Sequence, residues 1–179
     1  PLMTVSEEPG RASAHFKGAC FALEGDLEAV AAADALTRRL GGMPAFIAPE
    51  SKAAYHAGAV FASNYLLTCL STAQDLLEEA GMTPETARAA LLPIARATVD
   101  NVGRLGPEAA LTGPIARGDV ETIRKHLRAV PPEIAALYEA LGRATIAIAR
   151  RAGLDAGRAE TVGRALGVRA ASVQREADG

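Results

Sequence analysis

Four polar residues in two separate stretches have the types needed for proton transfer and for anion binding. His56 and Asn64 interrupt a long apolar helical pattern, and residues spaced by four and eight lie along one side of a helix. Thr112 and Arg117 lie in a later loop that is punctuated by glycine and proline. An imidazole exchanges protons near neutral pH, and a guanidinium with a hydroxyl can bind an anionic group. We therefore predict that His56 and Asn64 are catalytic and that Thr112 and Arg117 bind substrate.

Each of these residues also has a purely structural interpretation. A lone histidine on an apolar helix, such as His56, is often a hydrogen-bonded residue of a core or an interface. Asn64 could bond to neighbouring backbone or set the register of a dimer. The loop around Thr112 could be a simple turn, with Asp119 as the N-cap of the next helix and Arg117 in solvent. The sequence leaves these alternatives open.

The composition is that of an ordinary globular protein with no nucleic-acid or membrane partner. The chain has 179 residues, 49% of them hydrophobic, and a formal net charge of −2. Basic residues are mixed with acidic ones and aromatics make up only 4%, so neither a phosphate-binding stripe nor base-stacking platforms are indicated. No apolar run approaches the roughly 20 residues that span a bilayer.

Cys20 and Cys69 lie far apart in apolar surroundings, and the chain has only 3 histidines. This pattern contains no cluster of metal ligands. We therefore predict two buried, reduced thiols in a cytoplasmic protein that holds no metal.

Residues 17–48 predict a strand, a helix and a second strand. The apolar run 17–23 precedes Asp26, a suitable N-cap for an alanine-rich helix over 27–40, and the second strand spans 43–48. Short connections make such a βαβ unit parallel and right-handed. Because two parallel strands alone leave open edges, we expect further strands from another chain or from an upstream segment of roughly 100 residues, or else poor order in both strands.

A helix of about 30 residues is predicted over 51–80, with Ser51 as its N-cap. At 1.5 Å per residue it would be about 45 Å long, and it is apolar on nearly every side. Tyr55 and Tyr65 are expected to pack rather than to act as acids. Such a helix must be buried all round, so we predict a homodimer built on it and on the helix near 133–152, with an interface above about 2,000 Å².

Capping residues and prolines divide the rest of the chain into shorter helices. Thr83 is predicted to cap the first of them, and Pro93 is predicted to kink or divide it. Asp119 is expected to cap a later one. The predicted helices cover residues 84–105, 107–111, 120–129, 133–152 and 156–166.

Four motifs carry a resemblance to a known family. They cover residues 45–50, 55–65, 100–107 and 111–119. With the preceding βαβ pattern, they resemble the Rossmann-like proteins that carry the domain of unknown function 2520. That family is similar in turn to the 6-phosphogluconate dehydrogenase, ketopantoate reductase, β-hydroxyacid dehydrogenase and pyrroline-carboxylate reductase enzymes.

The resemblance implies a mainly α fold with a small α/β part. Residues 1–50 would be the end of a Rossmann-like dinucleotide-binding domain. Residues 51–168 would form a helical dimerisation and substrate domain like the C-terminal domain of 6-phosphogluconate dehydrogenase. Residues 169–179 would form a frayed tail. The implied activity is that of an NAD- or NADP-dependent oxidoreductase acting on a small hydroxy or imino substrate. The substrate cleft would lie between the carboxyl edge of the sheet and the helical domain, lined by all four candidate residues.

The chain departs from the related enzymes in two ways, and the second departure favours an alternative function. The glycine-rich dinucleotide fingerprint is expected upstream of Pro1, because Gly41 and Gly42 follow a helix rather than a strand, and the chain alone should not bind NAD(P) tightly. The related enzymes commonly place a lysine four residues before the asparagine, where this chain has Val60. His56 is one turn further back, about 6 Å along the axis. The alternative function is a non-catalytic dimerisation or ligand-sensing module.

Overall fold

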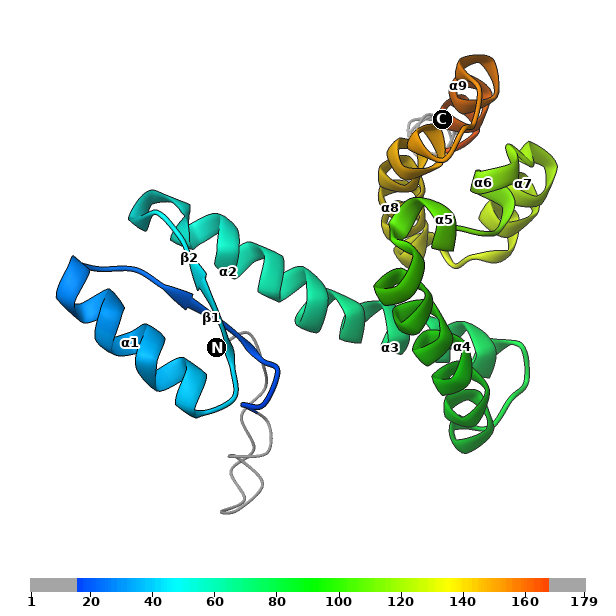
Figure 1. The fold of residues 1–179 in the computed structure, drawn as a ribbon. Helices are drawn as coiled ribbons and strands as arrows, with labels where there is room; N and C mark the ends of the chain where they lie inside the picture. Colours follow the sequence, from blue (N-terminus) through cyan, green and yellow to red (C-terminus); the bar gives the residue numbers. More distant parts are fainter. Residues whose placement is uncertain (1–15, 168–179) are drawn as a thin grey trace. The chain divides into compact units, whose positions relative to one another are not determined.

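The computed structural model describes residues 16–167, which form mainly helices and one small parallel sheet (Figure 1). They divide into two compact units, the first ending at Cys69 and the second beginning at Leu70. Among residues 16–167, no helix is both long enough and apolar enough to cross a membrane. The predicted frayed tail over 169–179 lies outside the described residues.

The first unit begins with the predicted βαβ arrangement. Strand β1 (Cys20–Leu23) is followed by helix α1 (Leu27–Arg39) and strand β2 (Met43–Phe46), and the strands run parallel with α1 beside them (Figure 1). The register pairs Cys20 with Met43, Phe21 with Pro44, Ala22 with Ala45 and Leu23 with Phe46. Both strands are shorter than predicted.

Local interactions explain where these elements begin and end. The Asp26 carboxylate accepts a hydrogen bond of 2.8 Å from the Ala29 amide, which confirms the predicted N-cap of α1. The β1 strand starts late because residues 16–18 form a turn. A Cβ atom at Gly42 would lie only 2.5 Å from the Phe21 ring, so the chain needs glycine where it enters β2.

The predicted long helix is present but contains a turn of a different type. A 3-10 turn (Pro49–Ser51) leads into α2 (Lys52–Val60), a π-helical turn (Phe61–Tyr65) and α3 (Leu66–Glu79). The predicted Ser51 cap is wrong, because Ser51 ends the 3-10 turn that begins at Pro49 and makes no side-chain capping bond.

The expectation that this helix is buried all round is also wrong for the single chain. Phe61 is 67% exposed and Leu67 is 69% exposed. The Phe61 ring packs edge-on against Tyr65, with centroids 4.8 Å apart, and Tyr65 is itself exposed. The aromatic residues of the π turn therefore contact each other, and their outer surfaces are left uncovered.

The second unit continues with helices only. They are α4 (Pro84–Leu105), α5 (Pro107–Ala110), α6 (Pro114–Arg117), α7 (Val120–Ala129), α8 (Pro132–Arg151) and α9 (Ala156–Ala165). Thr83 caps α4 as predicted, accepting from the Thr86 amide at 3.3 Å. Pro93 lies inside α4 without dividing it. Of the described residues beyond 50, none forms a strand, as predicted.

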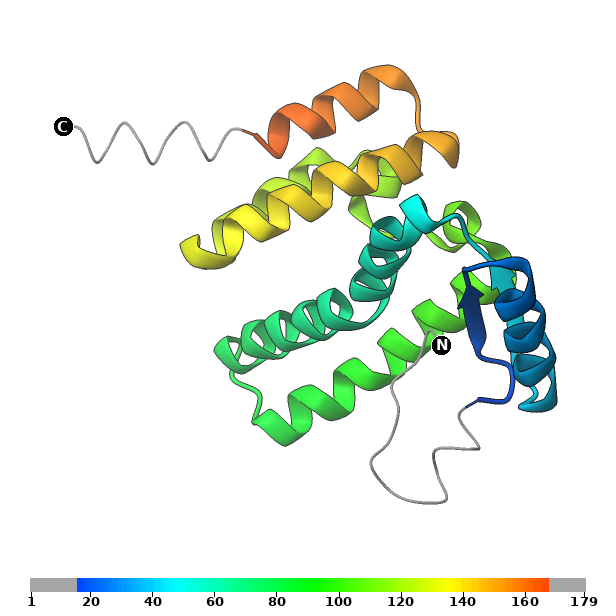
Figure 2. The same ribbon diagram turned by 90° about the vertical axis from the view of Figure 1, so that its left-hand side faces the viewer.

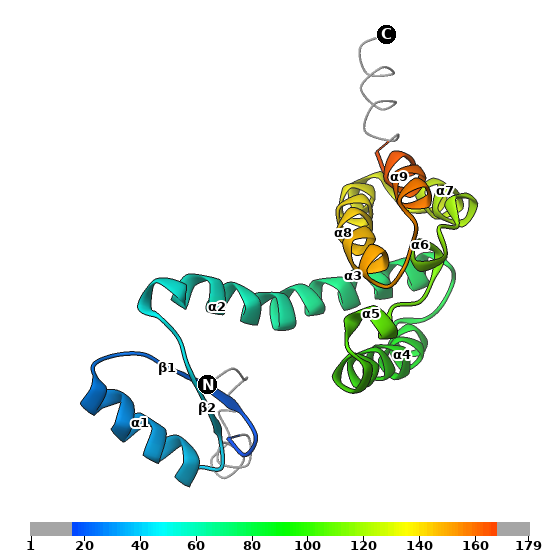
Figure 3. The ribbon, with the colours of Figure 1, turned by 45° about the horizontal axis from the view of Figure 1, so that its top comes forward.

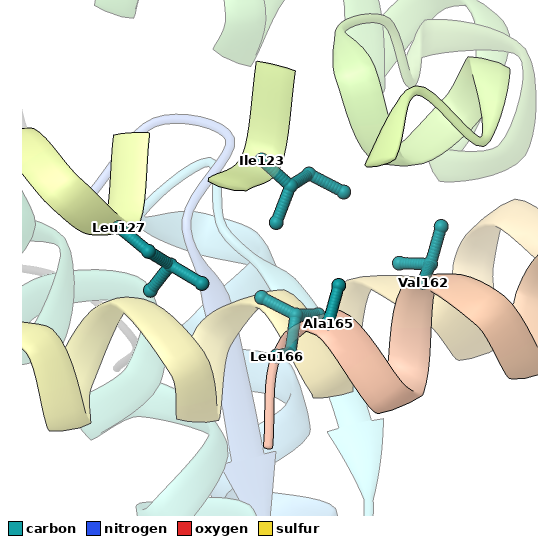
Figure 4. Close-up of a cluster of buried hydrophobic side chains, with 5 residues drawn as sticks. All are labelled: Ile123, Leu127, Val162, Ala165 and Leu166. Atoms are coloured by element: carbon teal, nitrogen blue, oxygen red, sulfur yellow. The ribbon is translucent and has the colours of Figure 1, made fainter. Parts of the chain in front are cut away.

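A cluster of buried hydrophobic side chains in the second unit joins α7 to α9. Its side chains are those of Ile123, Leu127, Val162, Ala165 and Leu166 (Figure 4). Helices α8 and α9 lie side by side and antiparallel (Figure 2), and α7 packs against α9 (Figure 3). Gly142 allows α8 to lie close to the end of α9, because a Cβ atom at this position would lie 2.8 Å from a methyl group of Leu166.

Cys20 and Cys69 are free thiols. Both are half-buried rather than buried as predicted, because β1 is covered by few residues and Cys69 lies on the sparsely covered long helix.

Candidate functional site

A groove of about 670 Å³ lies at the carboxyl ends of the two parallel strands. Its lining residues are Ala22, Glu24, Ile47, Pro49, Glu50, Lys52, Ala53, Tyr55 and His56. Small-molecule sites commonly measure about 300–1,000 Å³, and ligands of open α/β sheets bind outside the carboxyl ends of the strands. All the lining residues belong to the first unit, so the groove is a feature of that unit alone.

His56 lies in the wall of this groove, on the second turn of α2. Its side chain is exposed, and among residues 16–167 its ring has no hydrogen-bond partner. The interpretation of His56 as a residue of the chain's own core is therefore wrong. Its roles as a proton donor or as an interface residue remain predictions.

Lys52 and Glu24 line the groove together and were not predicted from the sequence. The Lys52 ammonium forms an ion pair with the Oε1 oxygen of Glu24, which follows β1 directly. Lys52 precedes His56 by four residues, so both side chains lie on the same face of α2. That spacing was the available signal for Lys52. The pairing with Glu24, 28 residues away, had no local signal.

The Glu24 carboxylate is only partly satisfied. Lys52 supplies a donor to Oε1, whereas Oε2 is buried and has no hydrogen-bond partner. An ionised carboxylate offers about four acceptor positions, so Glu24 keeps unused acceptor capacity, although its Oε2 atom has no surface open to the groove. Within the described residues no three His, Cys, Asp or Glu side chains are grouped as metal ligands.

Asn64 lies in the π turn and does not line the groove. The Ser63 hydroxyl donates to the Ala59 carbonyl at 2.7 Å, and it lies 2.9 Å from the Asn64 Oδ1 atom. Eight residues of α-helix would place Asn64 about 12 Å from His56 along the axis and about 80° around it. A π turn holds more residues per turn and so reduces that rotation, which brings Asn64 closer to the His56 face. The axial separation remains, so one small reacting group cannot contact both side chains without a bridging group.

Thr112 and Arg117 belong to the second unit, and both are exposed. Arg117 ends the short helix α6, and Gly118 follows it in the left-handed conformation, with φ of 66°. A Cβ atom at Gly118 would lie 3.2 Å from the Arg158 side chain, so the loop packs closely on α9. The prediction that Thr112 and Arg117 share a site with His56 stays a prediction.

Asp119, at the end of this loop, is the N-cap of α7, as the structural interpretation of the loop predicted. Asp119 accepts from the Thr122 amide at 3.0 Å and from the Thr122 hydroxyl at 2.7 Å. These hydrogen bonds, first the one from the hydroxyl, lower the pKa of Asp119. Asp119 is therefore explained by local structure and needs no role in binding.

The turn between β1 and α1 does not fit the pyrophosphate of a dinucleotide. The Asp26 side chain already accepts from the Ala29 amide at the start of α1, and Glu28 adds a second carboxylate to the first turn. A phosphate-binding turn needs free amides and glycines that let the backbone approach. The described residues thus offer no phosphate cradle at this position.

Comparison with family models matches residues 19–145 to a domain of unknown function, DUF2520. Searches of curated proteins and of solved structures found no match. The matched segment includes both strands, the groove with His56, the π turn with Asn64 and the loop with Thr112 and Arg117. Because the match covers well over half of the chain, this protein belongs to the DUF2520 family.

Proposed function

We propose that the chain is the substrate-binding and helical portion of an NAD(P)-dependent oxidoreductase that acts on a small hydroxy or imino substrate. The observation that carries the proposal is the groove at the carboxyl ends of β1 and β2, with the exposed His56 in its wall. Parallel α/β sheets bind their ligands on this side. The resemblance of the sequence motifs to the 6-phosphogluconate dehydrogenase-like enzymes supplies the reaction type.

In this proposal His56 exchanges a proton with the oxygen or nitrogen of the substrate. Its imidazole is exposed to the groove and can reach a bound molecule directly or through one water. Asn64 would orient the substrate, and Arg117 with the Thr112 hydroxyl would bind an anionic group of a longer ligand. Because Asn64 lies about two turns from His56, it would act on a part of the substrate away from the reacting atom.

The cofactor, NAD or NADP, would supply or accept the hydride. The turn between β1 and α1 does not fit its pyrophosphate, so this turn is not proposed to hold the cofactor. The described chain contributes the substrate side of the site.

Two further properties belong to this proposal. We expect a homodimer, because Phe61 and Leu67 expose large apolar side chains on the long helix. We also expect a cytoplasmic location, which the free thiols of Cys20 and Cys69 support.

The proposal is tested on the full-length protein by following NADH and NADPH absorbance with a panel of small 2-oxo acids and cyclic imines. His56→Gln should lower kcat by about 10²- to 10⁴-fold, as expected for loss of a general acid or base. The matched control is His126→Gln, which changes an exposed histidine of α7 in the second unit. Equal kcat values for His56→Gln and the unchanged protein would remove His56 from the mechanism.

A second candidate function is a non-catalytic ligand-sensing or dimerisation module, and Val60 favours it because the related enzymes commonly have a lysine there. This function predicts that small molecules bind the groove but that no member of the panel is turned over with either nucleotide. Detectable turnover that depends on His56 would exclude it.

A further inference from the structure

The groove has an excess of negative charge and of hydrogen-bond acceptors. Glu24 and Glu50 contribute two carboxylates, and Lys52 is the one Lys or Arg among the described lining residues. The two carboxylates outnumber the one ammonium, so one carboxylate has no lysine or arginine in the groove as a counter-charge. A ligand with a positive charge and N–H donors would balance the groove better than an anionic one.

The Lys52 ammonium occupies the position that a ligand cation would take. It bonds to one oxygen of Glu24, although its own side chain is 69% exposed. An ion pair with so exposed a lysine contributes little stability, so a competing ammonium can share or replace it at small cost. Lys52 is therefore an internal substitute for a bound amine.

The other lining residues select an apolar body for such a ligand. The groove lining also includes the apolar side chains of Ala22, Ile47, Pro49 and Ala53. We propose that the groove binds a protonated amine with a compact apolar body, and that Glu24 is the residue that accepts its N–H groups. This inference rests on the proposed function only in that the groove binds a small molecule. It adds the chemical class of that molecule.

Three matched probes test the class. Cyclohexylamine, cyclohexanol and cyclohexanecarboxylate share one ring and differ in charge and donor groups. Each is titrated at neutral pH into the ¹⁵N-labelled chain, and the amide signals of Ala22, Ile47 and Ala53 report binding. We expect saturable shifts with the amine, and affinities for the alcohol and the carboxylate that are lower by about tenfold or more.

Variants test the role of Glu24. Glu24→Gln should weaken binding of cyclohexylamine by about tenfold, because a charge-assisted hydrogen bond is lost. Lys52→Met should strengthen it by up to about fivefold, because the internal competitor is removed. The matched control is Glu28→Gln, which removes an exposed carboxylate of α1 outside the groove and should change nothing. Unchanged signals from the paired residues of β1 and β2 verify that each variant is folded.

Several outcomes would overturn the inference. They are equal affinity for the amine and the alcohol, tighter binding of the carboxylate, or amine binding that Glu24→Gln leaves unaltered. The titration contains no nicotinamide, so Glu24-dependent amine binding would stand even if the full-length protein never oxidised or reduced a substrate. Conversely, the full-length protein could turn over oxo acids while the groove binds no amine. That result would support the proposed function and reject only the protonated amine as the ligand of the groove.

Discussion

The buried cluster between α7 and α9 allows a quantitative test of how the second unit is stabilised. Ile123 is 0% exposed and packs with Val162 and Leu166 (Figure 4). Ile123→Ala removes three buried carbon atoms and leaves a cavity that neighbouring helices fill only in part. Such substitutions cost about 2–5 kcal/mol, and we expect about 3 kcal/mol because the site is fully enclosed. Ile123→Val, which removes one methyl group, should cost about 1 kcal/mol.

The assay is urea unfolding monitored by circular dichroism. With a slope of about 2 kcal/mol per molar urea, Ile123→Ala should lower the midpoint of the second unit's unfolding by about 1.5 M. The matched control is Ile94→Ala on α4, where the same chemical change is made to a side chain that is 66% exposed. The control should shift the midpoint by less than about 0.25 M.

A small midpoint shift for Ile123→Ala, comparable with that of Ile123→Val, would refute the assignment of this cluster as the stabilising core. A large shift for Ile94→Ala would show that another surface covers α4 in solution. The two substitutions therefore separate burial within the chain from burial by a partner.

Three further predictions concern the loop before α7 and the long helix. The pKa of Asp119 is lowered in the folded state, so its carboxylate stabilises the fold at pH values above its ordinary pKa near 4. This contribution is lost as the pH falls through the lowered pKa. The unfolding free energies of Asp119→Ala and of the unchanged protein, measured during an acid titration, should therefore converge at low pH. Gly118→Ala should cost about 1–2 kcal/mol in urea unfolding, because the residue has a positive φ and a new Cβ would crowd Arg158; an unchanged midpoint would contradict this. Leu67→Ser should lower the mass measured by light scattering at micromolar concentration if the long helix forms a dimer interface, and a monomer mass for the unchanged protein would reject the dimer.

Residues within one turn of a helix end could be predicted from sequence because the interactions involved are local. Asp26, Thr83 and Asp119 all cap helices as predicted, since each side chain bonds to an amide three residues later. Ser51 has the right residue type but does not cap, because Pro49 starts a 3-10 turn two residues earlier. A capping residue type therefore predicts an N-cap only where the residue is not already part of a preceding helical turn.

The interior of the long helix was less predictable. Its length follows from the apolar pattern, but the π turn over Phe61–Tyr65 does not, because no proline or glycine marks it. The Ser63 hydroxyl bonds to the Ala59 carbonyl within that turn, an interaction that serine makes in ordinary helices as well. The position of Asn64 relative to His56 therefore could not be derived from i, i+4 spacing.

The sequence by itself determined the order of the elements, the parallel βαβ unit, most helix boundaries and the location of His56 next to the carboxyl edge of the sheet. These features depend on propensity, capping and the handedness of a short crossover, all of which act over a few residues. Only the tertiary structure decided that Glu24 meets Lys52 and that an acidic groove surrounds His56. Glu24 and Lys52 are 28 positions apart in the sequence. They meet because parallel pairing of the strands brings the end of β1 beside the start of α2, and no local sequence pattern encodes that proximity.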